Sequence, residues 1–201
     1  MSGAAIEFYF DFSSPYGYLG AQRIDAIGAE FGRTVTWRPI LLGVIFKATG
    51  QSPLVSQPIR GPYSARDMAR SARKLGVKFA LPEGFPFSSI YACRIFYWLE
   101  GQSPETAKTY ARAVFNSAFA EGRIVAEPEA AVDLAVSLGQ DRAAVLAGMQ
   151  DPAVKERLRD ETQQAMHKGV FGSPFTIVDG EPFWGNDRLG EVREWLQTGG
   201  W

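Results

Sequence analysis

An aromatic run that leads directly into a helix start, at residues 8–19, constrains the fold more than any other stretch of the sequence. The bulky residues in its first half are typical of a buried strand. Ser14 and Pro15 then form a helix start, because serine can cap free N–H groups and proline suits the first helical position. Ser14 is either an ordinary cap, as Ser103 is in a similar Ser-Pro pair, or part of an anion site at the positive end of the helix dipole.

The first sixty residues predict a strand, a helix, a second strand and then a long loop. We expect these elements at 5–12, at 15 to about 30, at 34–38 and at 40–62 respectively. Pro39 ends the second strand. A strand–helix–strand unit of this length implies parallel pairing with a right-handed crossover. The loop is rich in glycine and proline and is long for a simple connection, which favours a functional role.

The pattern from residue 65 to residue 168 is helical throughout. Helices are predicted at 65–75, 89–99, 104–121, 128–138, 141–148 and 152–168. Strand character returns at 174–178 and 182–184 around an Asp179-Gly180 hairpin turn, and a last helix follows. The order is that of a thioredoxin-like α/β fold, β-α-β and then β-β-α, with an all-helical insertion. We expect the thioredoxin-like domain at 1–62 and 169–201 and the inserted helical domain at 63–168.

Charge and cysteine content exclude several classes of function. The formal net charge of −1 offers no basic surface for nucleic acid, and no apolar stretch reaches membrane-spanning length. We find no leader-like start, and the single cysteine, Cys93, favours a cytoplasmic location. We interpret Cys93 as a buried structural residue and His167, the only histidine, as a surface residue at a helix end. A metal site or a Ser-His triad therefore has little to be made from, and we expect no metal.

Two later stretches could complete a peptide-binding site at the first helix start. Pro174 opens a strand after a glycine-rich approach and is a candidate cis-proline. In the predicted fold it lies beside that helix, where Ser173 could offer its backbone N–H and C=O to an extended peptide. Residues 184–188 combine a helix start with Asn and Asp side chains, which suit a peptide's carboxylate and amine. For Asp187 taken alone, a simple cap of the last helix is the more common role.

Together these stretches resemble the 2-hydroxychromene-2-carboxylate isomerases. The matching motifs are Phe10-Asp11-Phe12-x-Ser14-Pro15-Tyr16-x-Tyr18-Leu19, Phe171-Gly172-x-Pro174 and Trp184-Gly185-Asn186-Asp187-Arg188-Leu189. Those proteins are bacterial glutathione-dependent enzymes of naphthalene breakdown. They are related to kappa-class glutathione transferases, in the disulfide-oxidoreductase branch of the thioredoxin fold. The resemblance covers essentially the whole chain and implies glutathione as the cofactor, a small aromatic substrate and a homodimer.

The resemblance also implies roles for individual residues. Ser14 matches the catalytic serine that hydrogen-bonds the glutathione sulfur. The tripeptide-binding positions are matched by Ser14, Gln51, Ser173, Pro174, Trp184, Gly185, Asn186 and Asp187. Lys47 and Phe85 match substrate-contacting positions, with Phe85 standing where the isomerases have a tyrosine. Ser13 replaces the usual leucine, which leaves open whether Ser13 or Ser14 meets the sulfur.

The residues at the first helix start suit a thiol that another molecule supplies. A disulfide oxidoreductase needs two cysteines spaced C-x-x-C there, whereas this chain has Ser14 and Gly17. Lowering a thiol pKa from about 8.5 by two units requires roughly 2.7 kcal/mol of thiolate stabilisation. A charge-assisted hydrogen bond supplies about 1.5–3 kcal/mol and the helix terminus about 0.3–1 kcal/mol.

We therefore expect a glutathione-dependent isomerase that works by reversible thiolate addition. Its expected reaction interconverts 2-hydroxychromene-2-carboxylate and trans-o-hydroxybenzylidenepyruvate, or a related aromatic ketoacid. Two alternatives stay open from the sequence: a kappa-type glutathione transferase of broad specificity, and a non-catalytic thioredoxin-fold binding module.

Overall fold

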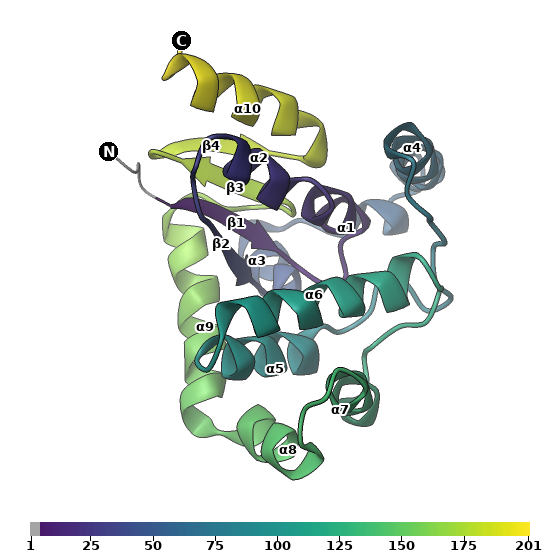
Figure 1. The fold of residues 1–201 in the computed structure, drawn as a ribbon. Helices are drawn as coiled ribbons and strands as arrows, with labels where there is room; N and C mark the ends of the chain where they lie inside the picture. Colours follow the sequence, from purple (N-terminus) through teal and green to yellow (C-terminus); the bar gives the residue numbers. More distant parts are fainter. Residues whose placement is uncertain (1–4) are drawn as a thin grey trace.

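A four-stranded mixed sheet lies at the centre of the computed structural model, which describes residues 5–201 (Figure 1). The strands are β1 (Ile6–Phe10), β2 (Val35–Pro39), β3 (Phe175–Val178) and β4 (Glu181–Trp184). Their order in the sheet is β2-β1-β3-β4. Strand β1 runs parallel to β2 and antiparallel to β3, and β3 pairs antiparallel with β4. The expected thioredoxin-like fold, with its parallel first unit and its later hairpin, is confirmed.

Strand β1 is buried on both of its faces, which explains its aromatic sequence. Phe8 and Phe10 belong to the larger apolar core, where the Phe10 ring lies 5.4 Å from the Phe115 ring of the helical insertion. Tyr9 points to the opposite face and joins a smaller cluster that includes Ile45. The insertion thus packs into the same core as the sheet, because aromatic side chains cross from one to the other.

The first helical segment is divided in two, which differs from the single helix expected. It consists of α1 (Pro15–Ala21) and α2 (Ile24–Glu30). The chain tightens between them, where the N–H of Arg23 donates to the carbonyl of Gly20 over 3.0 Å. A bond to the third preceding residue closes a narrower turn than the α-helical bond to the fourth, so the helix ends there.

The loop expected at 40–62 is wrong, because most of this segment is helical. It contains α3 (Leu42–Thr49), a short 3-10 turn (Leu54–Ser56) and the start of α4 (Arg60–Leu75). Helix α3 ends at Gly50, which has the left-handed φ of 70° that glycine adopts freely. The boundary expected between residues 62 and 63 falls within the first turn of α4. The division into two domains stays a prediction, and residues 1–4 of its first range lie outside the described residues.

The other helices of the insertion begin and end close to their expected bounds. They are α5 (Ile90–Glu100), α6 (Pro104–Phe119), α7 (Pro128–Ser137), α8 (Arg142–Gln150) and α9 (Pro152–His167). Helices α7 and α8 lie at the end of the insertion that is away from the sheet, and α9 leads back to β2 (Figure 1). A 3-10 turn (Asn186–Arg188) then leads into α10 (Leu189–Thr198), which packs on β3 and β4. No helix within the described range is long and apolar enough to cross a membrane.

Candidate active site

Ser14 joins the start of α1 to the loop before β3. It is the N-cap of α1 and only 6% exposed. Its Oγ accepts the N–H of Gly17 over 3.0 Å and lies 2.9 Å from the carbonyl oxygen of Ser173. Because a carbonyl can only accept, the hydroxyl must donate its proton to Ser173. Ser14 therefore uses both its donor and one acceptor position inside the protein.

Small residues on α1 let the loop of Pro174 approach closely. A Cβ placed on Gly17 would lie 2.9 Å from Ser173 Oγ, and one on Gly20 would lie 3.0 Å from Pro174 Cγ. The Ser173–Pro174 peptide bond is cis, as the sequence indicated. The first two stretches of the predicted site are thus in direct contact.

Residues 184–188, the third stretch of the predicted site, are hydrogen-bonded to the loop that carries Pro174. The N–H of Gly185 donates to the carbonyl of Pro174 over 3.0 Å, and the Arg23 guanidinium donates to the carbonyl of Asn186 over 3.3 Å. The 3-10 turn that contains Asn186 packs against α1. Ser14, Ser173, Pro174, Gly185 and Asn186 therefore lie together.

Two exposed side chains border this cluster. The Trp184 indole is 54% exposed and packs edge to face on Phe171, with ring centroids 4.8 Å apart. Asp187 is also exposed, and its carboxylate folds back over Gly185, whose φ is 117°. A negative side chain beside free N–H groups of a helix start suits a ligand that carries an amine.

Tyr16, in the first turn of α1, connects the site to α4. Its hydroxyl donates to the Asp67 carboxylate over 2.7 Å. Burial, this hydrogen bond to Asp67 and the negative charges of Asp67 and Asp187 raise the pKa of the Tyr16 hydroxyl well above its ordinary value. Tyr16 is thus a neutral donor at any physiological pH. The backbone N–H of Tyr16 has no acceptor one helical turn earlier, because it occupies the second helical position.

Asp11 is the site residue that the sequence reasoning missed. It is 4% exposed at the end of β1, and its carboxylate accepts the N–H groups of Ser13 and Leu42, each over 2.8 Å. Burial raises the pKa of the Asp11 carboxyl, although these bonds and one from the Ser89 side chain oppose the rise. The available signal was a carboxylate within an aromatic run, since a buried charge needs several partners.

The remaining predicted residues are Lys47, Gln51 and Phe85. Lys47 is exposed in the last turn of α3, and Gln51 is exposed just beyond it. Phe85 is half-buried, with its ring 6.2 Å from Phe119. Over residues 5–201, neither a hydrogen bond nor an ion pair nor a ring contact joins these three side chains to Ser14. Their assignment to the site stays a prediction.

The Ser13 side chain contacts the loop that carries Phe85. Its Oγ accepts the N–H of Phe87 over 3.0 Å, so it holds this loop beside the start of α1. Ser14 is the serine at the cap and against Ser173, which favours it as the residue that meets a sulfur.

The two residues interpreted as bystanders lie where expected. Cys93 is fully buried, and burial together with the Asp11 charge raises the pKa of its thiol well above the ordinary value. Such a thiol is not a nucleophile near neutral pH. His167 is exposed in the last turn of α9. Both interpretations are confirmed.

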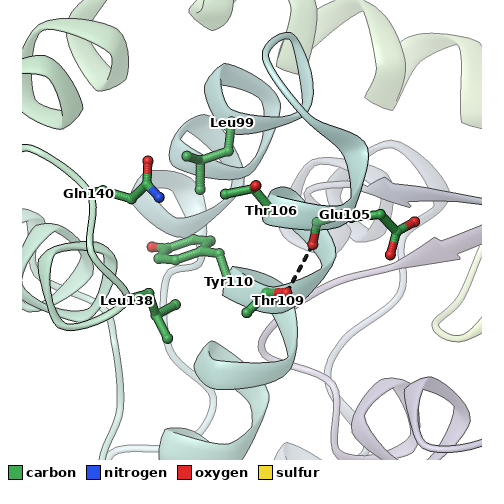
Figure 2. Close-up of a pocket in the computed structure, with 7 residues that line it drawn as sticks. All are labelled: Leu99, Glu105, Thr106, Thr109, Tyr110, Leu138 and Gln140. Carbon is green, nitrogen blue, oxygen red and sulfur yellow. Dashed lines mark hydrogen bonds between the residues drawn. The ribbon is translucent and has the colours of Figure 1, made fainter.

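An open cavity of about 260 Å³ lies elsewhere, between α5, α6 and the connection from α7 to α8. Figure 2 shows its lining residues, which are Leu99, Glu105, Thr106, Thr109, Tyr110, Leu138 and Gln140. None of them belongs to the predicted site. The Tyr110 hydroxyl donates to the carbonyl of Ala131 over 3.1 Å. A second, larger hollow of about 460 Å³ borders the site at Trp184 and extends along β4 and α10.

The chain is similar over nearly its whole length to several known proteins. Residues 5–197 match the family of DSBA-like thioredoxin domains. The chain is 30% identical over 188 residues to a 2-hydroxychromene-2-carboxylate isomerase of Pseudomonas putida, covering 92% of this chain and 90% of that protein. It is 26% identical to the glutathione S-transferase kappa 1 of Homo sapiens, over 92% and 87% of the two chains.

The similarity over nearly the whole chain extends to a solved structure. The structure of a 2-hydroxychromene-2-carboxylate isomerase superposes with a TM-score of 0.83 at 29% identity, covering 96% of this chain and 94% of that one. The helical insertion is therefore matched along with the sheet.

Proposed function

Because this chain belongs to the 2-hydroxychromene-2-carboxylate isomerase family, within the DSBA-like thioredoxin domains, we propose that it is a glutathione-dependent isomerase. The proposed reaction interconverts 2-hydroxychromene-2-carboxylate and trans-o-hydroxybenzylidenepyruvate, or a related aromatic ketoacid. The observation that carries the proposal is Ser14 at the cap of α1 and against Ser173, with no cysteine at position 14 or 17. This arrangement can stabilise a thiolate that comes from outside and cannot exchange disulfides itself.

The residues of the site suit a γ-glutamyl tripeptide. Ser173 precedes the cis bond and can present its backbone to an extended peptide. Asn186 and the exposed carboxylate of Asp187 suit the amine and carboxylate of the γ-glutamyl end. Gln51 and Trp184 are proposed to border the same ligand. When bound at this position, glutathione supplies a nucleophilic thiolate.

Ser14 is proposed to stabilise the sulfur's negative charge. Its hydroxyl proton is directed at Ser173 in the structure, so rotation about the Cβ–Oγ bond is needed to present that proton to a sulfur. A charge-assisted bond of about 1.5–3 kcal/mol then replaces a neutral one of about 0.5–1.5 kcal/mol, a net gain of about 1–2 kcal/mol. The helix terminus adds about 0.3–1 kcal/mol. The total corresponds to a pKa lowered by about one to two units, somewhat less than the sum expected without the bond to Ser173.

The substrate is proposed to lie between α3 and the loop of Phe85. Lys47 would pair with a substrate carboxylate, and its exposed position in the last turn of α3 leaves its ammonium accessible. Phe85 and Phe87 would contribute apolar surface for an aromatic ring. Ser13 supports this wall because it anchors the N–H of Phe87.

A kappa-type glutathione transferase is the second candidate, favoured by 26% identity over 92% of the chain to a kappa transferase. The same thiolate would serve both reactions, and a leaving group on the substrate would decide between them. We further propose a cytoplasmic location and a homodimer. Light scattering on the purified protein tests the homodimer.

The deciding experiment follows the isomerisation of 2-hydroxychromene-2-carboxylate by ultraviolet absorbance. We expect conversion with reduced glutathione and none with S-methylglutathione, whose sulfur cannot ionise. Conjugation of 1-chloro-2,4-dinitrobenzene without isomerisation would favour the transferase. Binding of glutathione with neither activity would favour a binding module.

A further inference from the structure

We propose that Asp11 is a positioning residue, whose hydrogen bonds hold Ser14 and Ser173 in the arrangement that meets the sulfur. The inference rests on the proposed function, because Ser14 and Ser173 are assigned to glutathione there. Asp11 itself touches neither substrate nor cofactor.

The backbone of Asp11 bonds both serines directly. Its N–H donates to Ser173 Oγ over 3.0 Å, and its carbonyl accepts the N–H of Ser14 over 2.9 Å. One residue thus links two segments that lie far apart in the sequence. A shift of Asp11 would change the distance between Ser14 Oγ and the carbonyl of Ser173.

The Asp11 side chain fixes the position of that backbone through two further hydrogen bonds. One carboxylate oxygen accepts the N–H of Ser13, and the other accepts the N–H of Leu42 at the start of α3. The carboxylate therefore ties the start of α1 to the start of α3.

An ionised aspartate satisfies both of these partners. Both backbone groups that face the carboxylate are N–H donors, so both oxygens must accept. An asparagine would turn its NH2 group toward one of those donors, and this buried N–H would lose its partner. Asp11→Asn therefore keeps the shape of the side chain and breaks at least one of its hydrogen bonds.

A direct effect of the Asp11 charge would have the opposite sign. A nearby carboxylate disfavours a thiolate, so removal of that charge alone should lower the pKa of a bound thiol. Loss of positioning should raise that pKa, because Ser14 no longer reaches the sulfur well. The direction of the shift separates the two effects.

The experiment compares Asp11→Asn with Asp25→Asn as the matched control. Asp25 is a partly buried carboxylate that accepts from Trp37, Lys108 and Arg112, and within residues 5–201 no hydrogen bond or ion pair joins it to Ser14 or Ser173. Ultraviolet titration gives the pKa of the thiol of enzyme-bound glutathione in each variant and in the Asp11→Asn/Ser14→Ala double variant. Amide hydrogen exchange of Gly17, whose N–H binds Ser14 Oγ, reports the position of Ser14 without glutathione.

We expect Asp11→Asn to raise the thiol pKa by at least half of the shift that Ser14→Ala causes. In the Asp11→Asn/Ser14→Ala double variant, the thiol pKa should equal that of Ser14→Ala alone. Gly17 exchange should become at least tenfold faster, while Asp25→Asn changes neither quantity. A lowered or unchanged thiol pKa, or fully additive shifts, would overturn the proposal. Wild type that binds no glutathione would end the proposed function, and Gly17 exchange would then decide the role of Asp11 alone.

Should Asp11→Asn fail to fold, Ser173→Ala removes the acceptor of the Asp11 N–H and leaves the backbone of residue 173 in place. It should shift the thiol pKa and Gly17 exchange in the same directions by a smaller amount. If Ser173→Ala leaves both at wild-type values, the proposal is wrong.

Discussion

The substitution Ser14→Ala removes a hydroxyl that has two bonds in the folded protein. Oγ accepts from Gly17 and donates to Ser173, and both bonds are lost. Loss of the cap costs about 1 kcal/mol of folding stability. The carbonyl of Ser173 loses a buried partner at a cost of about 1–3 kcal/mol, which brings the total to about 2–4 kcal/mol.

The effect on a bound thiol follows from the exchange of hydrogen bonds at Ser14. A net stabilisation of about 1–2 kcal/mol is lost, and 1.36 kcal/mol corresponds to one pKa unit, so the thiol pKa should rise by about one unit. A higher thiol pKa means less thiolate at neutral pH. Activity at pH 7 should therefore fall about three- to tenfold and recover above the new pKa.

The assay is ultraviolet titration of the thiolate of enzyme-bound glutathione, paired with a pH–rate profile. Ser103→Ala is the matched control, because Ser103 caps α6 before Pro104 and accepts the N–H of Thr106. It should cost about 1 kcal/mol of stability through loss of the cap alone, and it should leave the thiol pKa unchanged. Ser13→Ala tests the neighbouring serine, whose Oγ binds Phe87 instead.

Two results would refute this reasoning. A shift with Ser13→Ala and none with Ser14→Ala would mean that Ser13 meets the sulfur. No shift with either variant would mean that glutathione is not activated at the start of α1.

Three other substitutions test the remaining parts of the site. Asp187→Ala should weaken glutathione binding about tenfold in calorimetry, and an unchanged affinity in a folded variant would remove Asp187 from the site. Lys47→Ala should raise KM for an anionic substrate and leave the glutathione Kd unchanged, whereas the reverse pattern would contradict the proposed division of the site. Gly172→Ala would place a Cβ 2.1 Å from Trp184 Nε1, so the indole must move. Tryptophan fluorescence should change and glutathione affinity should fall, while Gly43→Ala, where a Cβ meets open space, should do neither.

Several features of the fold could be predicted from the sequence because they depend on neighbouring residues. Ser14 and Pro15 encode the start of α1, and the Asp179-Gly180 turn joins β3 to β4 with φ angles of 53° and 92°. The cis bond before Pro174 was anticipated from its glycine-rich approach and from the fold. These are preferences of a few adjacent residues, and a single sequence displays them directly.

Helix α3 shows where local patterns fail. Glycine and proline around residues 40–62 indicated a loop, yet the N–H of Leu42 finds its acceptor in Asp11. An acceptor supplied from another strand leaves no trace in the sequence near the helix that it supports.

The sequence by itself determined which segments could form the site, through the aromatic strand, the Ser14 cap, the Pro174 loop and the turn at 185–188. Only the tertiary structure decided the state of the Ser14 hydroxyl, whose proton is directed at Ser173. That bond joins residues separated by 159 positions. The physical reason is that a hydroxyl bonds whichever acceptor packing brings within 3 Å, and packing is a property of the whole fold.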